Sequence, residues 1–167
     1  MAYSRDSALN VHKDYKENVM NWEYYIRSYN GGYDYTLGQY LNRYNLELDN
    51  EFNQRLANTP CDNHCRNVIQ IYSSFLFRVK PSRDFGSMSE EQSLDTFLKD
   101  ADLDGNNFNN VIKQAQNYSS IYGHCFMILD KPNLTLGTRA EELQQEVRPY
   151  ISIVTPENVL DWNFKRE

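Results

Sequence analysis

The sequence predicts an α+β fold, in which about five helices are followed by a small β-sheet at the C-terminal end. Two observations lead to this class. Apolar residues recur every three or four positions over much of residues 1–122, which is the period of an amphipathic helix. From Gly123 onward, apolar residues gather instead in short runs of strand length, separated by prolines and polar residues. Residues 1–122 are therefore expected to be mainly helical, and residues 123–167 to form strands and a hairpin.

The first helix is expected from residue 11, where one apolar stripe is formed by Val11, Tyr15, Val19, Trp22 and Ile26. Gly31 and Gly32 end it, because glycine suits the residue that follows a helix. A second helix is expected over residues 36–59, where the same spacing recurs in Leu37, Leu41, Tyr44, Leu48 and Phe52.

The third helix is predicted to start at Thr59 and Pro60, which have the pattern of an N-cap followed by proline at the first helical position. Its expected core-facing residues are Cys65, Val68, Ile69, Tyr72 and Leu76. A short fourth helix with Leu94, Phe97 and Leu98 follows the capping-box spacing of residues 89–92. The stripe of the fifth helix consists of Phe108, Val111, Ile112, Ala115, Ser119 and Tyr122.

The sheet is predicted from two apolar runs, residues 124–130 and residues 150–154. Between them, residues 133–147 are expected to be a loop or a short charged helix. Residues 155–158, with the sequence TPEN, are predicted to turn the chain into a further apolar run, Val159–Phe164. This turn would make residues 149–162 a hairpin.

The charge balance argues against a nucleic-acid binding arm. The 167 residues contain 17 Lys and Arg against 23 Asp and Glu, a net charge of −6, and no basic block. Weak contact with DNA stays open, because net charge does not describe any one surface. The sequence has no long uncharged apolar run, and its first ten residues are too polar for a signal peptide. We therefore expect no contact with a membrane and a chain made in the cytoplasm.

The acidic stretch 100–111 half matches a calcium-binding loop. Asp100, Asp102 and Asp104 occupy its first, third and fifth places, and Gly105 its sixth. The twelfth place requires a bidentate carboxylate but holds Val111, which cannot bind calcium. We therefore favour a turn between two helices, with Asn106 or Asn107 capping the second, and predict no metal or cofactor.

Cysteine and histidine residues offer a second possible metal site, of the zinc type. The candidates are Cys61, His64, Cys65, His124 and Cys125. The set lacks the usual C-x-x-C knuckle, and Cys65 falls within an apolar helical stripe, where cysteine behaves as a small hydrophobic residue. An odd number of cysteines without a secretory signal predicts free thiols.

No catalytic motif is present in the sequence. It has no G-x-S-x-G, no phosphate loop, no glycine-rich dinucleotide turn and no paired histidine motif. We therefore predict that the protein is not an enzyme. The alternating residues Leu160, Trp162 and Phe164 are compatible with a partner-binding surface and equally with this protein's own core.

Five phrases, in this order along the chain, resemble the N-terminal, wing-type part of tailed-bacteriophage portal proteins. They are WEYYIRSYNGGYDY (22–35), residues 51–77 with Glu51 and Arg55 ahead of CDNHCRNVIQIYSSFLF, LKDADLDGNNFNNVIKQA (98–115), YGHCFMILDKP (122–132) and RPYISIVTPENVLDW (148–162). The residues that carry the resemblance are Trp22, Gly31, Gly32, Gly105, Gly123, Pro149, Tyr150, Pro156, Glu157, Asp161 and Trp162.

This resemblance implies a structural virion protein without catalytic residues. Portal proteins form rings, usually of about twelve subunits, at one capsid vertex. Double-stranded DNA is packaged and ejected through the ring without sequence-specific binding. The partners implied are the major capsid protein, scaffold, terminase and the connector or tail. The whole of residues 1–167 would belong to a wing-like domain, with stem, clip and crown in further chain. The alternative is an interaction module stabilised by calcium or zinc.

Overall fold

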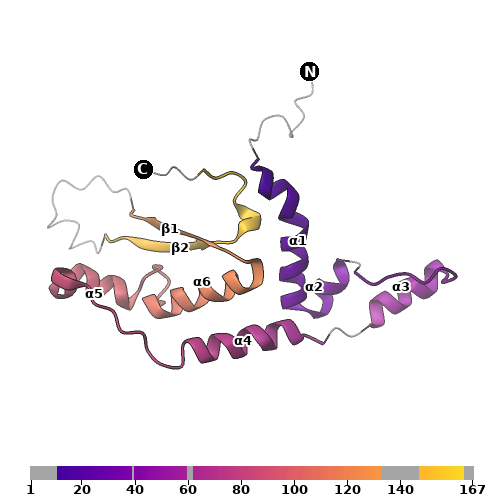
Figure 1. Ribbon diagram of the computed structural model, residues 1–167, viewed down its shortest axis with the longest axis horizontal. Coiled ribbons are helices and arrows are strands. Elements are labelled where there is room, and N and C mark those ends of the chain that lie inside the picture. Colours follow the sequence, from indigo (N-terminus) through magenta and orange to yellow (C-terminus); the bar gives the residue numbers. More distant parts are fainter. Residues whose placement is uncertain (1–10, 39, 60–61, 133–146, 164–167) are drawn as a thin grey trace, which may run out of the picture. The chain divides into compact units, whose positions relative to one another are not determined.

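The computed structural model describes residues 11–38, 40–59, 62–132 and 147–163. Within this part of the chain, six helices and one two-stranded antiparallel sheet form an α+β fold (Figure 1), which confirms the predicted class. The chain divides into two compact units. Unit 1 comprises residues 1–72 and 156–167, and unit 2 comprises residues 73–155.

Unit 1 begins with the predicted first helix. It contains α1 (Lys13–Asn30), α2 (Gly32–Leu37), α3 (Asp49–Asn58), most of α4 (His64–Leu76) and the short 3-10 helix η3 (Pro156–Asn158). Helix α1 ends at Gly31, as predicted, and the Gly31 N–H donates to the Arg27 carbonyl at 2.8 Å. The backbone of Gly31 has φ 67° and ψ −167°, a combination that is essentially restricted to glycine.

The prediction of one long helix over residues 36–59 is wrong. Helix α2 ends at Leu37, and α3 starts only at Asp49. The start of α3 is fixed by side-chain chemistry, because the Glu51 carboxylate accepts the Leu48 N–H at 3.2 Å. The connecting residues instead pack around an ion pair between Glu47 and Arg55. The apolar spacing continued across this break although the helix did not.

Thr59 ends a helix instead of starting one, contrary to the prediction. Its N–H and its hydroxyl both donate to the Arg55 carbonyl, at 2.9 Å and 2.6 Å. Helix α4 begins later, and the Asn63 side chain acts as its cap by accepting the Arg66 N–H at 2.9 Å. Pro60 lies outside the described residues.

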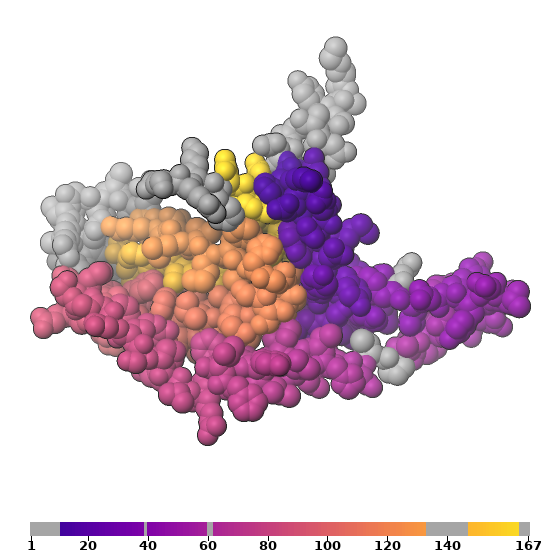
Figure 2. All heavy atoms as spheres, in the orientation of Figure 1, coloured from indigo at the N-terminus to yellow at the C-terminus, as the bar shows by residue number. Residues whose placement is uncertain are grey.

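The predicted core face of α4 is also wrong, because most of its apolar side chains are exposed. The exposed fractions are 52% for Val68, 65% for Tyr72 and 62% for Leu76. Cys65 is exposed as well, and Ile69 is only partly buried. Atoms of α4 lie at the visible surface in the space-filling view (Figure 2, magenta).

Unit 2 contains the predicted fourth and fifth helices and both strands. Its elements are the 3-10 helix η2 (Gly86–Glu90), α5 (Gln92–Lys99), α6 (Phe108–Tyr122), β1 (Phe126–Asp130) and β2 (Tyr150–Val154). The predicted capping box at residues 89–92 does not form: Glu91 is the N-cap of α5 and makes no side-chain cap. Asn107 caps α6 as predicted, accepting the Asn110 N–H at 3.0 Å.

The core of unit 2 joins α6, the sheet and the turn before α6. Its buried residues are Ala101, Val111 and Ile151, with Phe97, Phe108 and Ile153 packed against them. Strands β1 and β2 pair so that Met127 faces Ile153 and Leu129 faces Ile151. The Ile151 N–H donates to the Ala101 carbonyl at 2.7 Å, which ties the turn to the strand. Full burial of an aliphatic side chain such as Ile151 contributes about 1.5–3 kcal/mol.

The predicted hairpin through TPEN does not form. Pro156–Asn158 is a turn of 3-10 helix, and residues 159–163 are not a strand. The backbone of this segment pairs elsewhere, because the Leu160 carbonyl accepts the His12 N–H at 2.9 Å. Phe164 lies outside the described residues, as do residues 133–146, for which a loop or short helix is predicted.

Candidate functional site

Four of the residues that carry the portal resemblance, Trp22, Pro156, Glu157 and Trp162, lie on or against α1 in unit 1. The Tyr15 hydroxyl donates to the Glu157 carbonyl at 3.1 Å, and the Tyr15 ring meets the Trp22 ring edge to face at 5.8 Å. Trp162 stacks on His12, with ring centroids 4.1 Å apart. Trp22 and Pro156 are buried. Residues 156–162 are thus held to α1 by hydrogen bonds and aromatic contacts.

The four glycines of the same set all have positive φ angles. Gly31 and Gly32 have φ of 67° and 57°, and Gly105 and Gly123 have φ of 90° and 89°. At Gly31, a side chain would also have no room, since an added Cβ would lie 2.8 Å from the Asn63 amide nitrogen. These positions therefore shape turns and helix ends.

The remaining residues of the set flank the sheet or lie at the surface. Pro149 is exposed, immediately before β2. Tyr150 pairs with Asp130 across the sheet, and its hydroxyl is 3.4 Å from the Asp130 carboxylate. Asp161 is exposed in unit 1. Of these three residues, Tyr150 takes part in strand pairing, and Pro149 and Asp161 lie at the surface.

Two of the three aspartates of the half-matched calcium loop, Asp100 and Asp102, bind the chain itself through their carboxylates. The Asp102 carboxylate accepts three hydrogen bonds: from the Asp104 N–H at 3.0 Å, from the Asn106 N–H at 3.1 Å and from the Asn106 side chain at 2.7 Å. Asp100 accepts the Gly105 N–H at 3.0 Å and forms an ion pair with Arg148. Their arrangement is that of the predicted turn between helices.

The electrostatics of this turn follow from the same bonds. Partial burial of Asp102 by itself raises its pKa, but the hydrogen bonds from Asn106 and Asp104 outweigh it, so the pKa lies below its ordinary value. The Asp102 carboxylate therefore stays ionised, and it accepts hydrogen bonds from backbone N–H groups. Within the described residues, no group of three or more His, Cys, Asp or Glu side chains is placed to hold a metal ion.

The cysteine and histidine candidates are dispersed over both units. Cys65 and His64 are exposed on α4. In unit 2, the Cys125 thiol lies 3.4 Å from the Ala115 carbonyl and 3.3 Å from the Ser119 hydroxyl, and the His124 ring meets Phe126 edge to face. Cys65 and Cys125 are free thiols, as predicted, and Cys61 lies outside the described residues.

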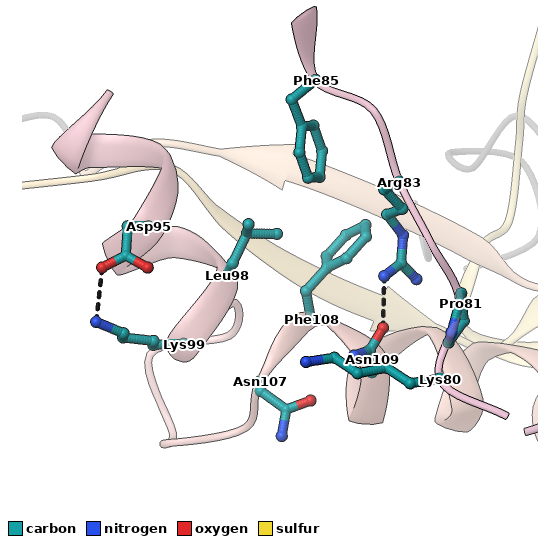
Figure 3. Close-up of a pocket in the computed structure, with 10 residues that line it drawn as sticks. All are labelled: Lys80, Pro81, Arg83, Phe85, Asp95, Leu98, Lys99, Asn107, Phe108 and Asn109. Atoms are coloured by element: carbon teal, nitrogen blue, oxygen red, sulfur yellow. Dashed lines mark hydrogen bonds and ion pairs between the residues drawn. The ribbon is translucent and has the colours of Figure 1, made fainter. Parts of the chain in front are cut away.

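A hollow in unit 2, which the sequence did not indicate, has a volume of about 610 Å³. Figure 3 shows its ten lining residues, which come from the segment before η2, from α5 and from the start of α6: Lys80, Pro81, Arg83, Phe85, Asp95, Leu98, Lys99, Asn107, Phe108 and Asn109. Three of these side chains are cationic and one is anionic. The hollow therefore carries a surplus of two positive charges in a chain whose net charge is −6.

The cationic side chains of this hollow have different partners. Lys99 forms an ion pair with Asp95 at 2.6 Å, one helical turn away. Arg83 donates to the Asn109 side-chain oxygen at 2.5 Å, and its guanidinium lies 4.9 Å from the centre of the Phe108 ring. Sequence reasoning missed this cluster because its members are up to 29 positions apart (residues 80–109) and form no basic block.

An ion pair in unit 1 links the loop before α3 to the helix. Arg55 contacts Glu47 through two hydrogen bonds of 2.8 Å, and its guanidinium lies 4.6 Å from the centre of the Tyr44 ring. The hydrogen bond from Arg55 is the main reason that the pKa of Glu47 falls from 4.5 to about 2. The pair has a structural role, since it closes the loop that interrupts the predicted helix.

Comparison with protein-family models finds no match for this chain, and comparison with curated proteins finds none either. Among the described residues, no helix combines the length and the apolar character needed to cross a membrane.

Proposed function

We propose that this chain is part of a structural subunit of a phage portal ring, located in the virion at the capsid vertex. In this role it would act without catalysis. Its partners would be further copies of itself, the major capsid protein, scaffold, terminase and the connector. Double-stranded DNA would pass through the ring without sequence-specific recognition. The basis of the proposal is the order of the five phrases along residues 22–162.

One structural observation supports this reading of the phrases. The two most distinctive ones, residues 122–132 and 148–162, contribute the two strands that pair as one antiparallel sheet. Their paired residues run from Phe126 opposite Val154 to Asp130 opposite Tyr150. The two phrases thus form one strand pair, which the proposal requires.

The oligomeric state of the intact gene product tests the proposal. Native mass determination followed by particle imaging should give a closed ring of about twelve subunits, because subunits joined by one repeated heterologous contact close into a cycle. Measurements over a range of concentrations separate assembly from aggregation. A gene product that stays monomeric at concentrations where rings should assemble would contradict the portal assignment.

A further inference from the structure

The hollow of unit 2 combines positive charge with an apolar wall. In Figure 3, the Phe85 and Phe108 rings and the Leu98 side chain lie above Lys80, Lys99 and Asn107, so the lining has an apolar side and a polar side. Its volume of about 610 Å³ falls within the range of about 300–1,000 Å³ that is typical of small-molecule sites. A ligand that fits both sides has a flat apolar part and an anionic part.

The charges of the hollow suit a phosphate group. Lys99 is neutralised by Asp95, but Lys80 forms no hydrogen bond or ion pair with another described residue. The described partner of Arg83 is the uncharged side chain of Asn109. Among the described residues, these two cationic groups therefore have no carboxylate partner, and a phosphate monoester carries a charge of about −1.5 to −2 at pH 7. Proteins commonly bind phosphate through the guanidinium group of Arg and the ammonium group of Lys.

The apolar wall suits a base. Aromatic side chains stack on nucleobases without regard to the identity of the base, because every base has a π-face. Phe108 already has the Arg83 guanidinium over its ring, at 4.9 Å from the centre, while the Phe85 ring points into the hollow. Phe85 is therefore the ring available for stacking, and Arg83 lies where a phosphate attached to the stacked nucleoside could reach it.

We infer that this hollow binds a nucleoside phosphate, with Lys80 and Arg83 on the phosphate and Phe85 against the base. The inference does not depend on the portal proposal, because the hollow consists of residues of unit 2 alone. No covalent step is involved, and the residues act as binding groups.

Calorimetric titration of the full chain with adenosine 5′-monophosphate, inorganic phosphate and adenosine tests the inference. The nucleotide should bind about tenfold or more tightly than either part alone, because only it engages both sides of the hollow. No measurable nucleotide binding at millimolar concentration would overturn the inference. Equal affinity for nucleotide and inorganic phosphate would overturn it as well, since the aromatic wall would then contribute nothing.

Variants distinguish a built site from general attraction to positive charge. Lys80→Ala should weaken nucleotide binding about tenfold without harming the fold, since Lys80 supports no other described residue. Lys113→Ala is the matched control, because Lys113 is exposed on α6 and does not line the hollow. Equal losses in these two variants would overturn the assignment.

The base contact is tested separately from the phosphate contact. Phe85→Leu should weaken binding of the nucleotide but leave binding of inorganic phosphate unchanged. If instead an acidic peptide binds as tightly as the nucleotide, the hollow recognises carboxylates and the nucleotide assignment is wrong.

Discussion

The two units differ in what holds them together. Among the described residues, six of the seven buried core side chains belong to unit 2: Ala101, Val111, Ala115, Ile121, Tyr122 and Ile151. Unit 1 contributes Trp22 to this set, beside the buried ring of Pro156, and depends more on hydrogen bonds, ion pairs and ring contacts around Tyr15, Arg55 and Asn63. An apolar core stabilises mainly through the area removed from water, whereas polar contacts depend on exact geometry.

Helices α6 and α4 show the consequence of this difference. Both have periodic apolar residues, but α6 buries Val111 and Ala115 while α4 leaves Val68 and Tyr72 more than half exposed. Apolar periodicity therefore predicted both helices, but it did not predict which of them had a partner to pack against within the described chain.

The largest expected effect comes from removing an apolar side chain from the core of unit 2. Ile151→Ala should lower the free energy of unfolding by about 2–5 kcal/mol, because Ile151 lies in the core of unit 2. Ile71→Ala, on the exposed face of α4, should change it by less than about 0.5 kcal/mol. Urea denaturation of both variants measures the difference. Equal losses would break the comparison, because they would show that the face of α4 is buried.

In unit 1, the backbone of one glycine should matter nearly as much. Gly31→Ala should cost about 2–3 kcal/mol, because a Cβ is disfavoured by the backbone angles and would clash with the Asn63 side chain. Gly32→Ala is the matched control, with a positive φ but no atom near the added Cβ, and should cost about 1 kcal/mol. Thermal denaturation of both variants shows which one loses more stability. If Gly32→Ala is the more damaging, the close packing at Gly31 does not stabilise unit 1.

A smaller effect is expected at the acidic turn of unit 2. Asp102→Ala should cost about 1–2 kcal/mol, since Asp102 accepts three hydrogen bonds, whereas Asp104→Ala should be nearly neutral because its carboxylate caps nothing among the described residues. Melting temperatures should be the same in calcium and in a chelator. If calcium instead raises the melting temperature of the unaltered chain, and both variants lose this increase, the metal-stabilised module would be favoured over the turn.

The smallest effect is a pH dependence in unit 1. The pKa of Glu47 is about 2 in the folded chain and 4.5 ordinarily, so the pair with Arg55 stabilises the fold fully above pH 4.5. This contribution is lost as the pH falls through about 2. NMR titration of the Glu47 carboxyl should show its pKa rising towards 4.5 in Arg55→Gln and staying low in the control Arg78→Gln. An unchanged pKa in Arg55→Gln would show that another group holds the carboxylate.

Local sequence signals predicted most of the elements correctly. The periodic apolar stripe and Gly31 predicted α1 and its end. The Asp-Gly turn and Asn107 predicted the start of α6, and the short apolar runs predicted β1 and β2. The errors arose where a distant contact decides the structure. Residues 40–48 are not helical, and Glu47 among them pairs with Arg55. Residues 159–163 do not form a strand, and the Leu160 carbonyl accepts the His12 N–H instead.

The candidate sites show the same limit. The missing carboxylate at Val111 favoured a turn over a calcium loop, and the structure shows that turn, in which Asp102 accepts the Asn106 N–H. A coordination rule of this kind can be checked within a few adjacent positions. The hollow lined by Lys80 and Lys99 could not be found in this way, since no short motif contains its residues. Only the packing of α5, α6 and the preceding segment brings them together.

The contact of α1 with residues 157–162 has a consequence for synthesis on the ribosome. Tyr15 and its partner Glu157 are 142 positions apart, and all of unit 2 lies between them in the chain. At translation rates of about 5–20 residues per second, α1 waits on the order of ten seconds for this partner. Unit 2, whose core contacts are complete by residue 155, is available for folding first. Helix α1, which is made before unit 2, thus completes its contacts after unit 2 can fold.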